Sequence, residues 1–247
     1  MRTTKNAMTK LTMALLFAGV PIGAAAEDWS WSLAPYAWLP AIGSNLNIDV
    51  PPIDTGGTTQ FSGWSPKLGF TIPLHLEGQG DDLGILSDIL YLPLSNDRDG
   101  RFFGTNTDLK AGVFELAGVW SPGPVRHEGF EVIGGLRYIW ANLDFELVPN
   151  NPALPRGKIS IDKDYPDFML GARYGARLSD RWSFTGRLDG SWGSSDGTVG
   201  ADAVFTYATS NGAWVIGYKY LKVNFSSHDV DARLKFYGPE FAYNFNF

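Results

Sequence analysis

The side chains best suited to chemistry in this chain are its three histidines and a set of regularly spaced acids and bases. His228 stands in Ser226-Ser-His-Asp-Val-Asp231, where Asp229 and Asp231 could orient the imidazole in a protease or share a metal ion. Adjacency within one polar loop is weak evidence for either role, and a serine hydrolase also needs a serine beside the imidazole. The chain has no cysteine and no phosphate-binding, dinucleotide-binding or zincin motif. We therefore predict no catalytic residue, no metal site and no cofactor.

The other two histidines have simpler interpretations. His75 alternates with Glu77, so both side chains are expected on the same face of a strand, with His75 as an internal hydrogen-bonding residue. His127 follows a Pro-Gly-Pro turn, where an imidazole is expected to face solvent.

Charged residues recur at every second position, opposite large apolar residues. Leu188 and Trp192 share one face of a predicted strand, whereas Arg187 and Asp189 share the other. A charge facing lipid at mid-membrane costs about 2 to 4 kcal/mol, so in a membrane barrel the charged face must point inward. Applied to every strand, this rule predicts a lumen charge network of Glu77, Asp88, Glu115, Glu131, Arg137, Arg173, Arg177, Arg187, Asp189, Asp202, Lys219 and Glu240.

Such an interior allows two functions. The acids and bases can neutralise one another as a salt-bridged plug, because an unpaired buried charge is expensive. They can also form a charged constriction that selects small solutes, as rings of charge do in pores. The interior of a small barrel is just wide enough for side chains to fill it, which favours the plug.

The elements that must position these residues are strands of alternating character separated by turn signals. The sequence predicts strands over 29–39, 67–79, 83–95, 107–121, 129–147, 168–178, 182–192, 198–209, 213–224 and 233–247. Short turns follow every even strand, and the longer connections 41–66, 96–106, 148–167 and 225–232 follow odd ones, apart from a short turn at 193–197. This parity is typical of a barrel with short periplasmic turns and longer outer loops. Pro73 and Pro93 fall inside predicted strands and are expected to mark bulges or strand ends.

The N-terminus predicts secretion. Arg2, Lys5 and Lys10 precede an apolar stretch that ends before the small residues Ala24-Ala25-Ala26. The stretch is shorter than the roughly 20 residues of a spanning helix and contains Pro21, which argues against a membrane anchor. We expect a cleaved signal peptide over residues 1–26 and one barrel domain over residues 27–247. Three of the 20 basic residues lie in that signal, which leaves 17 against 26 acids and a net charge of −9, so no nucleic-acid partner is expected.

The C-terminus places an aromatic ring at every second position of the last strand, at Phe241, Tyr243, Phe245 and Phe247. One face of this strand is therefore apolar and the other polar, as in a barrel strand between lipid and a polar lumen. We interpret these rings as the signal for insertion into the outer membrane.

Several segments resemble a family of Gram-negative outer-membrane β-barrel proteins with no assigned physiological role. They are Trp31-Ser-Leu-Ala-Pro-Tyr-Ala-Trp-Leu-Pro40, Gly135-Leu-Arg-Tyr138, the run from Gly171-Ala-Arg-Tyr174 to Arg187-Leu-Asp-Gly190, Gly217-Tyr-Lys-Tyr-Leu221 and Gly238-Pro239. The resemblance implies a barrel inserted by the outer-membrane assembly machinery and implies no catalytic residue. Lys219 stands where the family carries arginine, and Glu240 where an aromatic residue is common; the added acid fits a lumen better than a lipid face.

The sequence thus predicts an all-β protein: a single transmembrane antiparallel up-and-down β-barrel of about ten strands, with eight or twelve as alternatives. We expect an integral protein of the cell outer membrane with both termini in the periplasm, in contact with lipid, lipopolysaccharide and the assembly machinery. A structural or surface-exposed role without catalysis ranks first, a narrow passive channel for small solutes second, and a barrel-embedded hydrolase third. The sequence indicates no particular oligomeric state.

Overall fold

The computed structural model describes residues 29–48, 59–60, 65–66, 73–99, 103–123, 125, 127–151, 156–227 and 230–247. The predicted signal peptide, 1–26, lies outside these residues. The strands are β1 (Ser30–Trp38), β2 (Ala41–Ile48), β3 (Thr59–Gln60), β4 (Ser65–Pro66), β5 (Leu74–Gln79), β6 (Leu83–Asp99), β7 (Phe103–Trp120), β8 (Gly129–Pro149), β9 (Gly157–Arg177), β10 (Trp182–Gly193), β11 (Thr198–Thr209), β12 (Gly212–Ser227) and β13 (Val230–Asn246). Across the described ranges, no helix is long and apolar enough to cross a membrane.

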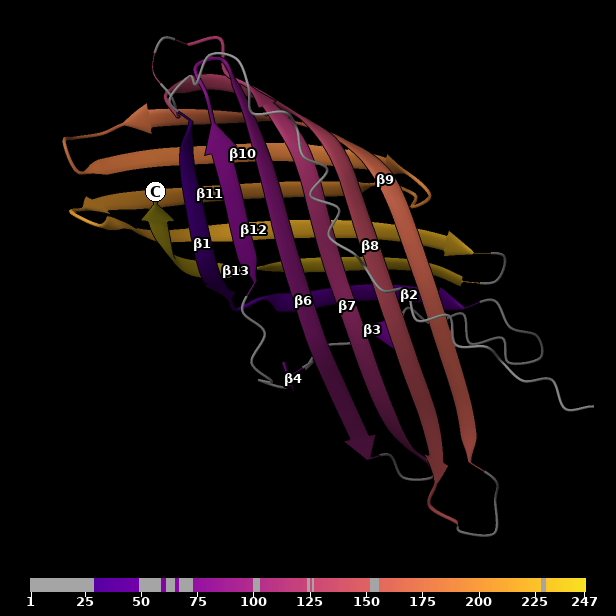
Figure 1. Ribbon diagram of the computed structural model, residues 1–247. Helices are drawn as coiled ribbons and strands as arrows, with labels where there is room; N and C mark the ends of the chain where they lie inside the picture. Colours follow the sequence, from indigo (N-terminus) through magenta and orange to yellow (C-terminus); the bar gives the residue numbers. More distant parts are fainter. Residues whose placement is uncertain are drawn as a thin grey trace, which may run out of the picture.

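The sheet closes on itself. Neighbouring strands pair in the order β1, β5, β6, β7, β8, β9, β10, β11, β12, β13, and β13 pairs again with β1. At the seam between β13 and β1, Trp31 and Phe247 exchange two backbone hydrogen bonds of 3.0 and 2.9 Å. In Figure 1 the strands β6 to β9 cross β10 to β13 obliquely, as strands in opposite walls of a tilted barrel do. The prediction of a closed antiparallel barrel of ten strands is confirmed.

The predicted loop 41–66 is wrong in its first part, because β2 is a strand. β1 pairs with the second half of β13, and β2 pairs with its first half. The two short strands therefore both pair with β13, one after the other. The interruption lies at Leu39-Pro40, where Leu39 N donates to Pro239 O at 3.0 Å. A Cβ on Gly238 would lie 2.1 Å from Leu39 O, so only glycine allows the two chains to approach this closely. Glycine and asparagine signals around this stretch resemble those of a loop, which explains the error.

The predicted outer loops after β6, β8 and β12 are also too long. β6 to β9 contain 17, 18, 21 and 21 residues, whereas a strand needs only about 9 to 11 to cross the hydrocarbon layer. Cross-strand pairs stabilise the polar extension: Lys158 lies 3.7 Å from Asp144, and Arg156 lies 3.4 Å from Glu146. The polar composition of these segments predicted loops. Polar side chains that pair between neighbouring strands are equally compatible with a β-strand.

Outward and inward faces follow the predicted alternation. Leu188 and Trp214 are each 61% exposed, whereas Arg137 on the other face is 1% exposed. The large apolar residues exposed on the outside include Ile85, Leu116, Leu136, Leu170, Tyr174, Trp182, Trp192, Phe205, Ile216, Tyr218, Phe241 and Phe245. These residues come from strands all around the barrel, so the apolar surface is a belt.

The two prolines occupy different places in the ladder. Pro73 directly precedes β5, as expected for a strand end, and its carbonyl accepts a hydrogen bond from Tyr36 N at 3.0 Å. Pro93 lies inside β6, opposite Lys110 of β7 in an unbroken register, so the bulge or strand end expected there is not found.

Adjacent glycines of β8 give a test of the packing. A Cβ on Gly135 would lie 2.2 Å from Leu116 O and 2.5 Å from Ala117 Cα, whereas a Cβ on Gly134 would meet only Leu170 Cδ1 at 4.0 Å. We expect Gly135→Val to lower the free energy of unfolding by about 1 to 3 kcal/mol, because the β7 backbone must shift. Gly134→Val, the control, should be nearly neutral. Urea unfolding in detergent, followed by tryptophan fluorescence, measures both; equal effects would contradict the assigned faces.

Candidate functional site

The centre of the barrel interior is occupied by one buried guanidinium with three sets of partners. Arg137 of β8 donates from Nε to Glu115 Oε1 at 2.8 Å and from Nη1 to Thr198 Oγ1 at 2.6 Å, and its Nη2 contacts Asp189 Oδ1. Glu115 lies on the adjacent strand β7 and Asp189 on β10, two strands away, so this side chain connects three strands of the ring. Arg187 completes the group by donating to Glu115 Oε2 at 2.7 Å. Its Nε lies 2.9 Å from Asp189 Oδ2 but lacks hydrogen-bond geometry.

Hydroxyl groups extend this network to the short turn at 193–197. Thr198 Oγ1 and Ser191 Oγ lie 2.6 Å apart, and Ser191 donates to Asp167 Oδ2 at 2.9 Å. Ser195 binds the same carboxylate through its backbone N at 3.0 Å and its Oγ at 2.5 Å. Asp167 therefore holds the turn between β10 and β11 closed, which explains why this connection is short.

A second ionic group lies nearer the short turns. Arg173 of β9 donates from Nη2 to Glu77 Oε1 at 2.6 Å and from Nη1 to Glu77 Oε2 at 2.8 Å, and its Nε contacts Glu131. The other oxygen of Glu131 accepts hydrogen bonds from Ser121 at 2.5 Å and Gln79 at 3.3 Å. The fork of the guanidinium thus matches one carboxylate bidentately and still reaches the next strand.

His75 joins this group to Asp88 on the neighbouring strand β6. Its Nε2 lies 3.3 Å from Glu77 and its Nδ1 lies 3.2 Å from Asp88. Asp88 Oδ1 also accepts a hydrogen bond of 2.8 Å from the hydroxyl of Tyr36, which Lys219 Nζ approaches to 3.4 Å. His75 is therefore an internal hydrogen-bonding residue, as the alternation predicts.

The structure brings most of the predicted lumen residues together. Glu77, Asp88, Glu115, Glu131, Arg137, Asp189 and Glu240 are buried, and Arg173, Arg187, Asp202 and Lys219 are partly buried on the same inner surface. Arg177 is set apart: its side chain is 62% exposed and pairs with Glu128 at 2.7 Å near a short turn. It is the last residue of β9, four residues beyond Arg173, and its described ion pair is with Glu128 and not with the two central groups.

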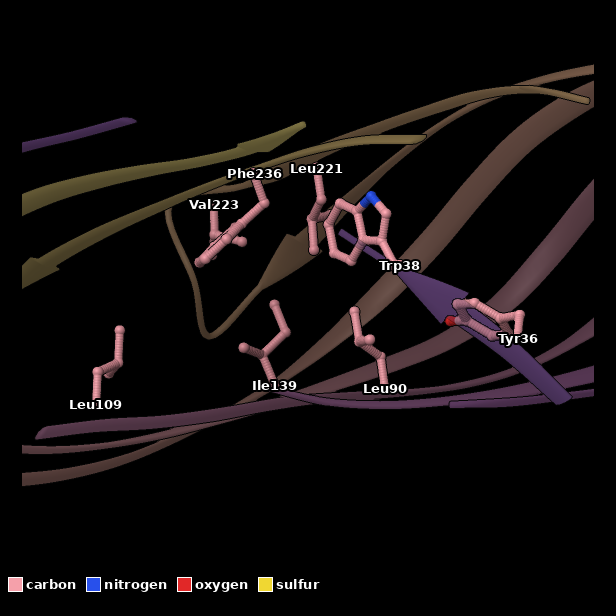
Figure 2. Close-up of a cluster of buried hydrophobic side chains, with 8 residues drawn as sticks. All are labelled: Tyr36, Trp38, Leu90, Leu109, Ile139, Leu221, Val223 and Phe236. Atoms are coloured by element: carbon pink, nitrogen blue, oxygen red, sulfur yellow. The ribbon is translucent and has the colours of Figure 1, made fainter. Parts of the chain in front are cut away.

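Beyond the charges, the interior is apolar. Figure 2 shows Leu90, Leu109 and Ile139 facing Leu221, Val223 and Phe236 across the barrel, with Trp38 and Tyr36 beside them. All eight are at most 7% exposed. We name these eight residues the apolar plug. Trp38 Nε1 donates to Gly238 O at 3.2 Å, which satisfies its polar atom inside this cluster.

On the other side of the charges the barrel is hollow. A cavity of about 900 Å³ is lined by turn residues 179–181 and by Asn244, Asn246 and Phe247, and it reaches His75, Arg187, Asp202, Lys219 and Glu240. The lining turn and the end of β13 place its mouth at the end of the barrel that carries the short turns. Its floor is the charge network, and the apolar plug lies beyond that floor.

Sequence reasoning missed several polar residues of the interior. Gln79 and Ser121 are 0% and 1% exposed, and Asp167, Ser191, Ser195 and Thr198 are also buried. Gln79 and Asp167 occupy inward positions of their strands, so the alternation could have found them. Ser121 and Ser195 lie outside the strands, and only the tertiary contacts identify them.

The remaining histidines add no catalytic arrangement. His127 is half exposed, and its Nδ1 lies 3.9 Å from Glu77 at the cavity wall. His228 and Asp229 lie outside the described residues. In the described ranges, no group of three or more His, Cys, Asp and Glu side chains could hold a metal ion.

Comparisons with known proteins agree on the fold. No protein-family model and no curated protein matches the sequence. Among solved structures, the outer membrane protease OmpT from Escherichia coli aligns with a TM-score of 0.53 and 8% identity, over 92% of this chain and 99% of that one. The fold is that of an outer-membrane β-barrel. The attachment invasion locus protein Ail of Yersinia pestis aligns with a TM-score of 0.40 and 10% identity, over 88% of this chain and 98% of that one.

Two arginines with contrasting surroundings test the network. Arg137→Ala would leave the buried carboxylates Glu115 and Asp189 with Arg187 as their remaining guanidinium neighbour, so we expect a loss of about 3 to 5 kcal/mol in the free energy of unfolding. Arg177→Ala removes an exposed pair and should cost at most about 1 kcal/mol. Urea unfolding of both variants in the same detergent gives the comparison. Similar losses for the two would show that the Arg137 network does not stabilise the barrel.

Proposed function

We propose that this protein is an integral outer-membrane β-barrel with a closed lumen and a structural or surface-exposed role without catalysis. The exposed belt of leucine, isoleucine and aromatic residues supports the membrane location, because a belt of this kind requires an apolar solvent. Lipid and the acyl chains of lipopolysaccharide are the partners that fit it.

The short turns, the start of β1, the end of β13 and the cavity mouth lie together at one end. In the proposed orientation this end faces the periplasm, and the extended parts of β6 to β9 project from the outer surface. The projecting strands then offer the surface through which the protein would act outside the cell.

The proposal of a closed lumen is supported by two groups of side chains that fill the barrel one after the other along its axis. The Arg137 network joins β7, β8, β10 and β11 inside the barrel, and the apolar plug lies beyond it. An ion crossing this barrel would have to displace paired charges and then enter a region lined by leucine, isoleucine and phenylalanine. Both steps oppose conduction.

Planar bilayer recording tests the proposal. The purified protein should show no stepwise conductance, in contrast to a general porin reconstituted in parallel. Trp38→Ala with Phe236→Ala removes two large rings from the apolar plug and is expected to produce at least transient steps. The cavity, which extends far into the barrel, favours a narrow passive channel as the second candidate, and regular steps from the unaltered protein would establish that function instead.

The C-terminal rings generate a separate prediction about assembly. Phe241, Tyr243 and Phe245 lie on the outer face of β13, and Tyr243 packs edge-on against Trp214 with ring centroids 4.8 Å apart. Deleting Phe247 removes a ring and two seam hydrogen bonds, whereas Phe247→Ala removes the ring alone. We expect both to lower the yield of heat-modifiable protein in the outer membrane, the deletion more strongly. Normal yield of the truncated chain would refute the assembly signal.

A further inference from the structure

The wall of the cavity contains two carboxylates that the ionic networks do not use. Asp202 of β11 and Glu240 of β13 both line it, on either side of β12. Glu240 is only 8% exposed. Within the described residues, no hydrogen bond or close ion pair reaches either carboxylate, although both feel the charge of Lys219.

Three other acids that line the cavity are engaged, whereas Asp180 lies in the turn at its mouth. Glu77 binds Arg173, Asp88 binds Tyr36 and His75, and Glu128 binds Arg177. Arg187 and Lys219 act on Asp202, and Lys219 and His75 act on Glu240. Arg187 already donates to Glu115 at 2.7 Å, and the closest hydrogen-bond contact of Lys219 is the Tyr36 hydroxyl at 3.4 Å, with its Nζ 5.0 Å from the centre of that ring. In the described part of the chain none of these bases forms a close pair with Asp202 or Glu240, so both carboxylates keep acceptor atoms that a bound donor could use.

A largely buried carboxylate without a partner is costly, and a cationic ligand offsets that cost by supplying charge and donors together. We propose that the cavity binds a small, water-soluble molecule carrying an ammonium group, whose N–H groups donate to Asp202 and Glu240. The site is open at the short-turn end, so the ligand enters from the side that the proposed orientation assigns to the periplasm.

Two features of the cavity indicate that its ligand is an organic cation and not a metal ion. The described acids and histidines form no cluster of three that could hold a metal, and the cavity of about 900 Å³ lies in the range of small-molecule sites. The wall beside the carboxylates consists of small side chains, among them Thr185, Thr206, Ala213 and Ala242, which leave space for the body of a solute. Recognition at this site therefore depends on the ammonium group.

Isothermal titration calorimetry of the refolded full chain in detergent tests this inference with 1,4-diaminobutane as the probe. We expect saturable binding of the diamine and none of 1,4-butanediol or succinate, which match its length without its charge. Glu240→Gln and Asp202→Asn should each weaken diamine binding about tenfold or more, because each removes one charged acceptor. Glu146→Gln changes a carboxylate on the extended part of β8, outside the cavity, and should leave the affinity unchanged.

Heat-modifiable gel mobility establishes that each variant is folded, so a loss of binding is not a loss of the barrel. No heat from the diamine, equal binding of the diol, or full affinity in Glu240→Gln would each overturn the proposal. Displacement of the diamine by millimolar Mg²⁺ would instead identify a site for inorganic cations, which also overturns it. Because the assay measures binding in detergent, its outcome is independent of whether the barrel conducts in a bilayer.

Discussion

The structure depends on the pairing of β13 with β1, since this seam converts a sheet with two edges into a ring with none. In lipid, an unpaired backbone N–H or carbonyl has no water to bind, so an open edge would be prohibitively costly. The seam runs from Trp38 opposite Glu240 to Ser32 opposite Asn246, and the last residue still exchanges hydrogen bonds with Trp31. Closure also creates an enclosed interior, and the properties of the lumen follow from that enclosure.

Once the ring is closed, inward charges can pair with charges on other strands. Arg137 and Arg173 each bind two carboxylates, one on the adjacent strand and one on a strand farther round the ring. The planar guanidinium has enough donors to connect several strands, which a lysine could not do with the same geometry. Lys219 illustrates the difference: its single ammonium group contacts Tyr36 and leaves Asp202 and Glu240 without a close partner. Satisfied networks close the middle of the barrel, and the unsatisfied carboxylates remain beside its cavity.

The division of the interior gives the two ends of the barrel different properties. The cavity and the charges lie toward the short turns, whereas the apolar plug lies toward the extended strands (Figure 2). Such a barrel can present a binding cavity to one compartment and still separate it from the other. The proposed closed lumen and the proposed ammonium site are therefore compatible, because the plug lies beyond the floor on which the ligand would rest.

The sequence alone indicated about ten strands, an up-and-down order and the inward face of the charged residues, because side chains alternate along a strand and a misplaced charge is expensive. Leu188 and Arg187 could be assigned to opposite faces without any tertiary information. Only the tertiary structure decided that the number is ten, which charges meet, that Arg177 lies outside the network, that Asp167 holds the 193–197 turn, and that an apolar cluster lies beyond the charges. Those contacts depend on the register between neighbouring strands and on the residues at which β2 and β6 to β9 end. Alternation within one strand fixes the direction of a side chain, whereas its height along the barrel is fixed by pairing with every other strand in the ring.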